Sequence, residues 1–183
     1  FIPDEHIRSI ANHFENNPEV NLSSIVYSGR SDLKFTSTFI KKYPQSINDR
    51  LYVIRKSHPD VKSLSPNEEY ELKSSTFEVI PYVFEDKEPV SSGAHYKLLG
   101  LVASKRCYKW ILKEYMAPRY LENNIDSYKV LLPESNGSGK FGETLSSPIV
   151  VGPGVSSTPT FISIGCFSTY KEAENLLKYL RTK

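Results

Sequence analysis

Two acidic residues and a lysine in the first half of the chain have the spacing of a metal-dependent nuclease site. Pro59-Asp60 is followed by Glu71-Leu72-Lys73, and such a set would place Mg²⁺ and activate a water molecule for phosphodiester cleavage. The pattern is degenerate, and Asp60 lies in a proline-rich turn rather than on a clear strand. A metal-dependent DNA nuclease that uses Asp60, Glu71 and Lys73 is therefore one alternative function.

A glycine-rich segment, Gly137-Ser138-Gly139-Lys140-Phe141-Gly142, matches the glycine pattern of a dinucleotide-binding turn. In that turn a helix begins at the glycines and its N-terminus meets the pyrophosphate, whereas here a strand-like segment follows. A Walker phosphate loop is excluded because no Ser or Thr follows Lys140. We interpret the segment as a loop of hydrogen-bond donors that could approach a DNA backbone, with a plain surface turn as the alternative.

Other catalytic or metal-binding patterns are missing from the sequence. The four histidines are scattered, at His6, His13, His58 and His95. Cys107 and Cys166 are too few for a disulfide framework or a zinc site, which favours a reducing cytoplasm. No Gly-x-Ser-x-Gly nucleophile motif occurs. We therefore predict no catalytic residue and no metal ligand in this chain.

Charge is distributed unevenly along the chain, although the net charge is only +2. Residues 101–120 hold five basic side chains against one acidic side chain, and residues 30–42 and 50–62 each hold four against one. Residues 64–89 hold seven acidic side chains against two basic ones. Basic segments interleaved with aromatic residues can bind a phosphate backbone if the fold brings them to one side. A solvated surface of mixed charge is the alternative.

The pattern of apolar residues predicts an α+β fold, with short strands in mixed or antiparallel sheets and about three helices. Helices are predicted at residues 3–14, 105–116 and 170–181, the last being an amphipathic helix that begins at a capping box of Thr169 and Glu172. Strands are predicted at residues 24–27, 51–55, 76–84, 128–132, 149–151 and 160–164, with residues 70–72 in one further strand and a turn at 152–154.

The composition is that of an ordinary globular protein, with 39% hydrophobic residues and a mean hydropathy of −0.39. No apolar run reaches the length of a membrane span, so we expect no membrane partner. The two cysteines favour a cytoplasmic location. The chain begins at Phe1 without a signal-peptide pattern and ends at Lys183 while a helical pattern continues. We expect a piece cut from a longer protein.

An ordered series of motifs fills the C-terminal third, at residues 128–133 (YKVLLP), 136–139 (NGSG), 141–143 (FGE), 160–167 (TFISIGCF), 172–175 (EAEN) and 178–183 (KYLRTK). A basic segment, residues 105–111 (KRCYKWI), precedes it. This order resembles the region after the catalytic domain in adenine-specific DNA methyltransferases of bacterial or archaeal restriction–modification systems. The resemblance extends from about Leu101 to the end and is weak before Val90.

The resemblance implies a target-recognition domain over residues 1–183, with 1–100 as its variable recognition part and 101–183 as its family-like part. Such a domain holds double-stranded DNA while a separate catalytic domain of the same polypeptide uses S-adenosylmethionine to methylate a flipped adenine. The Asn/Asp-Pro-Pro-aromatic motif and the cofactor motif of that domain are absent here. We therefore expect this chain to hold no cofactor and to be inactive alone, while some relatives carry a nuclease elsewhere in the polypeptide.

Candidate DNA-binding residues follow from the basic segments. Phosphate contacts are predicted for Lys105, Arg106, Lys109 and Lys113, and then for Lys140 with the amides of Gly137 and Gly139. Base reading is predicted for Arg30, Lys34, Arg55 and Lys56, with ordinary surface charges as the alternative. A protein–protein interaction module without a DNA role is the second alternative function.

Overall fold

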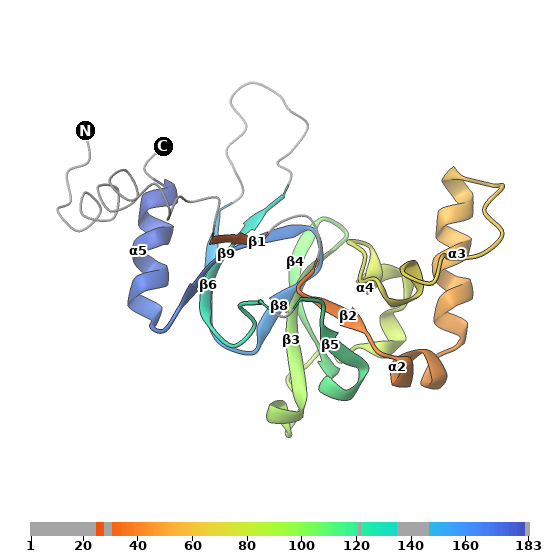
Figure 1. The fold of residues 1–183 in the computed structure, drawn as a ribbon, viewed down its shortest axis with the longest axis horizontal. Coiled ribbons are helices and arrows are strands. Elements are labelled where there is room, and N and C mark those ends of the chain that lie inside the picture. Colours follow the sequence, from red (N-terminus) through yellow and green to blue (C-terminus); the bar gives the residue numbers. More distant parts are fainter. Residues whose placement is uncertain (1–24, 28–30, 121, 135–146, 182–183) are drawn as a thin grey trace. The chain divides into compact units, whose positions relative to one another are not determined.

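A computed structural model describes residues 25–27, 31–120, 122–134 and 147–181. Helices and short strands in antiparallel and mixed sheets make up the fold, which confirms the predicted α+β class. The chain divides into two compact units (Figure 1). Unit 1 comprises Phe1–Gly29, Asn124–Gly154 and Phe161–Lys183, and unit 2 comprises Arg30–Asn123 and Val155–Thr160.

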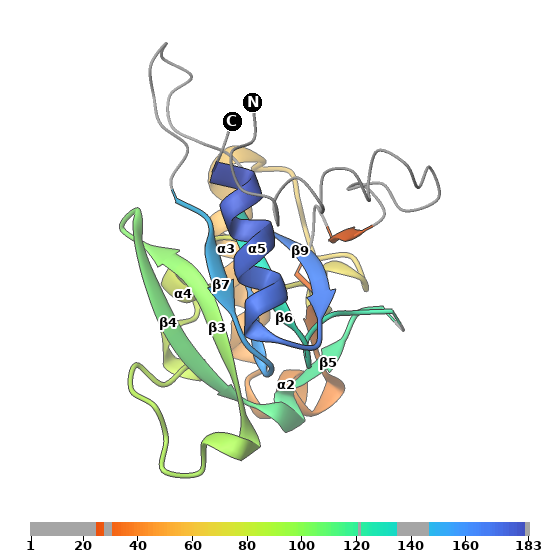
Figure 2. The same ribbon diagram turned by 90° about the vertical axis from the view of Figure 1, so that its left-hand side faces the viewer.

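Unit 1 contains an antiparallel sheet with the strand order β1-β9-β6-β7. Its strands are β1 (Val26–Tyr27), β6 (Tyr128–Pro133), β7 (Ile149–Val151) and β9 (Phe161–Phe167). Helix α5 (Tyr170–Arg181) lies across this sheet (Figure 2) and packs Leu176 against Val130 and Ile164. The predicted capping box is confirmed, because the amide and hydroxyl of Thr169 both donate to Glu172 Oε2 at 2.9 Å.

A buried polar network ties the loop before β6 to β9. Lys129 is fully buried, and its Nζ donates to the carbonyls of Asn124 at 2.6 Å and Ile125 at 3.3 Å. The Asn124 side chain in turn donates to Ser163 Oγ and to the Gly165 carbonyl, both at 2.7 Å. A buried ammonium and a buried amide would be costly without such partners, so the network fixes the path of this loop.

Unit 2 is built from a three-stranded sheet, a two-stranded ladder and short helices. The sheet has the order β4-β3-β8, in which β3 (His95–Val102) and β4 (Lys105–Leu112) form a hairpin and β8 (Val155–Ser157) runs parallel to β3. The ladder pairs β2 (Leu33–Phe35) with β5 (Met116–Pro118). The helices are α2 (Ser37–Lys42), α3 (Gln45–Ser57) and α4 (Thr76–Val79), with 3₁₀ turns at Glu68–Tyr70, Pro81–Val83, Ser92–Ala94 and Lys113–Tyr115.

Three sequence predictions for unit 2 are wrong. Residues 105–116, predicted as a helix, form strand β4 and a 3₁₀ turn, because Lys109 and Ile111 are buried in alternation rather than at helical spacing. Residues 51–55, predicted as a strand, lie inside α3, which buries Arg50 and Leu51. Residues 76–84, predicted as a strand, form α4 and a 3₁₀ turn that begins at Pro81.

Other predicted elements agree with the structure or lie outside it. Strands β6, β7 and β9, the short β1 and helix α5 match their predicted positions closely. The predicted turn at residues 152–154 is present, with a φ of 77° at Gly154, and β8 follows it. In place of a strand at 70–72, Glu71 makes an isolated bridge to Lys34. The helix predicted at residues 3–14 lies outside the described residues.

The β3–β4 hairpin turns through two residues that both have a positive φ. Ala103 has a φ of 47° and Ser104 a φ of 62°, as in a type I′ turn, where Asn-Gly is the preferred pair. The left-handed region costs an ordinary residue about 1–2 kcal/mol because Cβ crowds the following carbonyl. Glu78 Oε1 accepts the Ala103 amide at 2.7 Å and helps to hold the turn.

The strained turn yields a stability prediction. Replacing the pair by Asn-Gly, through Ala103→Asn and Ser104→Gly together, is expected to raise the free energy of unfolding by about 1–2 kcal/mol. Urea denaturation measures the change. Ser63→Gly is the control, since Ser63 is exposed and outside any positive-φ position, and this change should not stabilise. A double variant less stable than the wild type would contradict the prediction.

Arg50 connects α3 to the segment that follows it. Its guanidinium donates to the Ser46 carbonyl at 3.1 Å within α3. It also donates to three carbonyls of the next segment, those of Glu68 at 3.2 Å, Glu69 at 2.9 Å and Glu71 at 3.4 Å. Burial lowers the pKa of Arg50, while the charges of Glu69 and Tyr82 raise it. One side chain thus fixes the backbone that leads to Glu71.

Removing this side chain should destabilise unit 2 strongly. Arg50→Met is expected to lower the free energy of unfolding by about 3–5 kcal/mol, because it leaves one buried and three part-buried carbonyls without their charged donor. Arg55→Met is the matched control. Arg55 also donates to two carbonyls, but it is exposed, so its loss should cost about 1 kcal/mol or less. Equal losses in urea denaturation would refute a special role for Arg50.

Candidate nucleic-acid interface

The β3–β4 hairpin places basic and aromatic side chains on one face. Lys97 pairs with Trp110 across the hairpin, and Leu101 pairs with Arg106. Because directly opposed residues of an antiparallel pair point to the same side, and so do residues two apart, Lys97, Arg106, Tyr108 and Trp110 share a face. All four are half-buried. We call this set the hairpin face.

The cation at the centre of the hairpin face is held by aromatic rings. Lys97 Nζ lies 4.6 Å from the Tyr108 ring centroid and 5.3 Å from that of Trp110. Cation–π attraction of this kind keeps an ammonium in place without neutralising its charge. Burial raises the pKa of Tyr108, an effect that Arg106 opposes, so the phenol is protonated at neutral pH and can donate a hydrogen bond.

The four residues predicted to contact phosphate are not on one side of the hairpin. Arg106 belongs to the hairpin face, while Lys105 is exposed beside the turn. Lys113 is exposed in the 3₁₀ turn after β4, with Nζ 5.4 Å from the Tyr96 ring centroid. Lys109 points to the opposite, buried face, where it forms an ion pair with Asp86. The predicted helix would have displayed all four, but strand alternation separates them.

The described residues among those predicted to read bases belong to other elements than the hairpin. Arg55 Nε and Nη2 donate to the carbonyls of Val61 and Lys62 at 2.8 Å each. These bonds connect the end of α3 to the segment that follows it. Lys56 Nζ lies 4.9 Å from the ring centroid of Tyr52, itself exposed on α3. Lys34 is exposed on β2. Arg30, Gly137, Gly139 and Lys140 lie outside the described residues.

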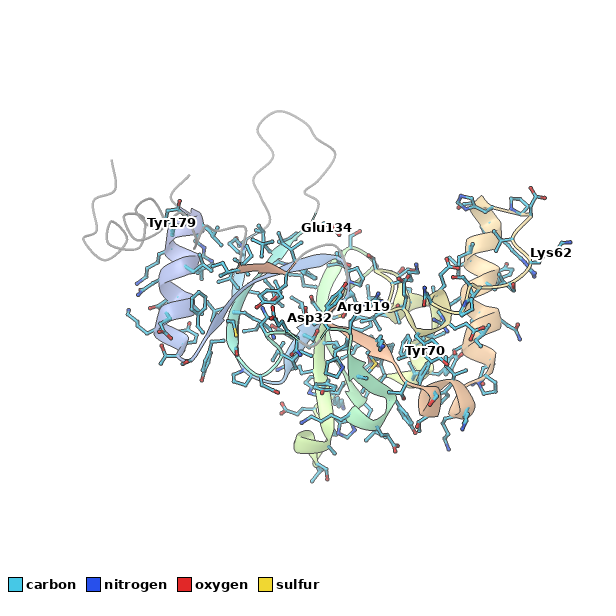
Figure 3. All side chains as sticks on the ribbon, viewed as in Figure 1. Asp32, Lys62, Tyr70, Arg119, Glu134 and Tyr179 are labelled. Carbon is cyan, nitrogen blue, oxygen red and sulfur yellow. The ribbon has the colours of Figure 1, made fainter. Side chains whose placement is uncertain are left out.

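Sequence reasoning overlooked Arg119, which follows strand β5. Its side chain is 14% exposed and borders a depression of about 510 Å³ that Lys34 also lines. Arg119 and Tyr70, another lining residue, are labelled in Figure 3. Arg119 was part of the basic tally for residues 101–120, but nothing in its immediate sequence pairs it with Lys34. We call this depression the Lys34–Arg119 basin.

The residues of the nuclease pattern are placed differently from one another. Glu71 Oε2 accepts a hydrogen bond from Lys73 Nζ at 2.6 Å, and Glu71 Oε1 lies 3.5 Å from Arg119 Nη1. Asp60 is exposed in the turn after α3. Over the part of the chain that the structure describes, no three His, Cys, Asp or Glu side chains come together in a group able to hold a metal ion. Glu71 is thus engaged by two cationic side chains.

Among the helices that the structure describes, none combines the length and apolar character needed to cross a membrane.

Comparisons with known proteins gave no matching family model, no matching curated protein and no matching solved structure.

Proposed function

We propose that this chain is a sequence-specific DNA-recognition module of an adenine-specific DNA methyltransferase or of a combined restriction–modification enzyme. The observation that carries the proposal is the hairpin face, where a lysine lies against two aromatic rings beside an arginine. The motif order of residues 101–183 supports the same assignment by resemblance. In this role the chain holds the target duplex and chooses its site.

Two kinds of interaction with DNA would form at the hairpin face. Lys97 and Arg106 would neutralise backbone phosphates and release counterions, which gives affinity without sequence information. Tyr108 and Trp110 offer ring edges and polar hydrogens to sugars and bases. Strand β8 pairs with Lys97–Leu99 of β3, and toward the turn the hairpin continues as a two-stranded ribbon. Such a ribbon has dimensions that fit the major groove, where each base pair presents a distinct pattern of donors and acceptors. The hairpin is therefore the element that we assign to groove contact, with Lys105 and Lys113 as flanking phosphate contacts.

The chemistry itself belongs to another part of the proposed enzyme. S-adenosylmethionine would be held by a catalytic domain of the same polypeptide, which methylates a base taken out of the duplex. No residue of this chain is assigned to the cofactor or to the methyl transfer. The proposed setting is the cytoplasm of a bacterial or archaeal cell, where the DNA substrate lies.

The two alternative functions differ from DNA recognition in measurable ways. A nuclease that uses Asp60, Glu71 and Lys73 is disfavoured because the Glu71 carboxylate faces Lys73 and Arg119, which compete with a metal ion for its oxygens. Mg²⁺-dependent plasmid cleavage that disappears in Asp60→Ala would support it. A protein–protein interaction module would bind no duplex at any salt concentration.

DNA binding through the hairpin face predicts a steep salt dependence. Fluorescence anisotropy with a mixed pool of duplexes should give a linear fall of log affinity with log salt concentration. In the variant Lys97→Gln with Arg106→Gln, affinity should fall about tenfold and the slope should decrease by about 2, one for each lost phosphate contact. Sequencing of the retained duplexes should reveal one preferred site.

The matched control removes two lysines from helix α5 of unit 1. Lys171 and Lys178 are 69% and 46% exposed and both pair with Glu174, so Lys171→Gln with Lys178→Gln changes the net charge equally. The control should keep the wild-type affinity and slope. Failure of the wild-type chain to bind any duplex at low salt, or equal losses in the two variants, would contradict the proposal.

A further inference from the structure

The Lys34–Arg119 basin is formed by the ladder of β2 and β5. Lys34 lies opposite Ala117 in this ladder, and the Arg119 amide donates to the Asp32 carbonyl at 2.7 Å, which continues the pairing by two residues. Residues two apart on a strand point to the same face. Lys34, Ala117 and Arg119 therefore share one face, and the small side chain of Ala117 leaves space between the two cations.

The other wall of the basin comes from the segment that Arg50 holds. Asn67 and Tyr70 line this side, and Ser37 lines the end near α2. Arg50 donates to carbonyls on either side of Tyr70, so this wall is fixed by a buried charge rather than by loose surface contacts. Both walls of the basin are thus anchored, one by the ladder and the other by Arg50.

Two cationic side chains, Lys34 and Arg119, line this space. Arg119 Nε is buried and has no hydrogen-bond partner among the described residues, while Nη1 makes a single long contact of 3.5 Å with Glu71. A buried donor without a partner is costly, so a ligand that satisfied it would gain affinity. Lys34 adds an exposed ammonium. The lining side chains of Ser37, Asn67 and Tyr70 add further polar hydrogens.

The chemistry of these donors favours a ligand made of acceptor oxygens. A phosphate group presents several such oxygens, and its hydrogen bonds to guanidinium and ammonium groups are shortened and strengthened by charge. Adenine and cytosine edges also present an amino donor, which the protein would have to accept, whereas guanine O6 and N7 are acceptors like the phosphate oxygens. The nearby carboxylate of Glu71 already binds Lys73 at 2.6 Å, and Asp32 is not among the residues that line the basin.

We propose that the Lys34–Arg119 basin binds a phosphate group, supplied by the DNA backbone when the duplex lies on the hairpin face. On binding, Arg119 exchanges its long contact with Glu71 for direct hydrogen bonds to phosphate oxygens, and Lys34 closes over the group. The backbone as the source of the phosphate rests on the proposed function, whereas the phosphate site itself does not. Arg119 would then position the DNA without reading its sequence.

The first arm of the test measures duplex binding. Lys34→Gln, a change at an exposed position, should reduce the slope of log affinity against log salt concentration by about 1 and leave the preferred sequence unchanged. Arg119→Lys keeps the charge but loses the planar fork, so it should weaken binding by about threefold to tenfold with a nearly unchanged slope. Lys62→Gln is the control, an equal change of charge at an exposed residue outside the basin, and it should behave as the wild type.

The second arm uses inorganic phosphate and needs no DNA. In the wild-type chain, the NMR resonance of the Arg119 Nε–H group, assigned by its loss in Arg119→Lys, should shift during a phosphate titration. The shift should require higher phosphate concentrations in Lys34→Gln. This arm also separates a free phosphate from a backbone phosphate as the natural source.

The outcomes test the phosphate site and the proposed function separately. Wild-type duplex binding with an unmoved Arg119 resonance and wild-type behaviour of both basin variants would overturn the basin and leave DNA recognition standing. A shifted resonance without any duplex binding would support the phosphate site and overturn DNA recognition. A changed sequence preference in Arg119→Lys would overturn the assignment to phosphate in favour of base reading.

Discussion

The arrangement of unit 2 depends on one buried cation whose hydrogens are accepted by backbone carbonyls. Arg50 is 5% exposed, and the partners of its guanidinium are main-chain carbonyls of α3 and of residues 68–71. A charge at this depth is tolerated only when its hydrogens are satisfied. The segment after α3 must therefore return to the helix at one position, which sets Glu71 beside Lys34 and Tyr70 over the β2–β5 ladder.

The hairpin shows how strand geometry divides similar residues between two roles. Lys109 and Lys97 are cations on paired strands, yet alternation turns Lys109 to the buried face, where it pairs with the exposed carboxylate of Asp86 and lies 5.8 Å from the Phe77 ring centroid. Lys97 points the other way, onto aromatic rings and without a carboxylate partner among the described residues. One lysine is thus part of the scaffold, and the other gives the scaffold a charged surface.

Local signals in the sequence were sufficient for a helix that begins at a capping box and for short apolar strands. The capping box at Thr169 and the spacing of Leu176 and its neighbours placed α5 correctly, and short apolar runs placed β6 and β7. The prediction failed at residues 105–116, where Cys107, Trp110 and Ile111 fit a helical stripe although the strand partner lies in β3. Arg119 was missed for a different reason, because its neighbours in space, Lys34 and Glu71, are distant in sequence.

Strand β8 gives the chain a connectivity that matters for exchanging parts between proteins. Residues 155–160 belong to unit 2, yet they lie in sequence between β7 and β9 of unit 1. Thr158 donates its amide to the Leu99 carbonyl at 2.9 Å, and Ser31 Oγ donates to the Ser157 carbonyl at 2.7 Å. A chimera that replaced only residues 30–123 would pair a foreign β3 with a native β8. The transplantable module is therefore two separate stretches of sequence that must be exchanged together.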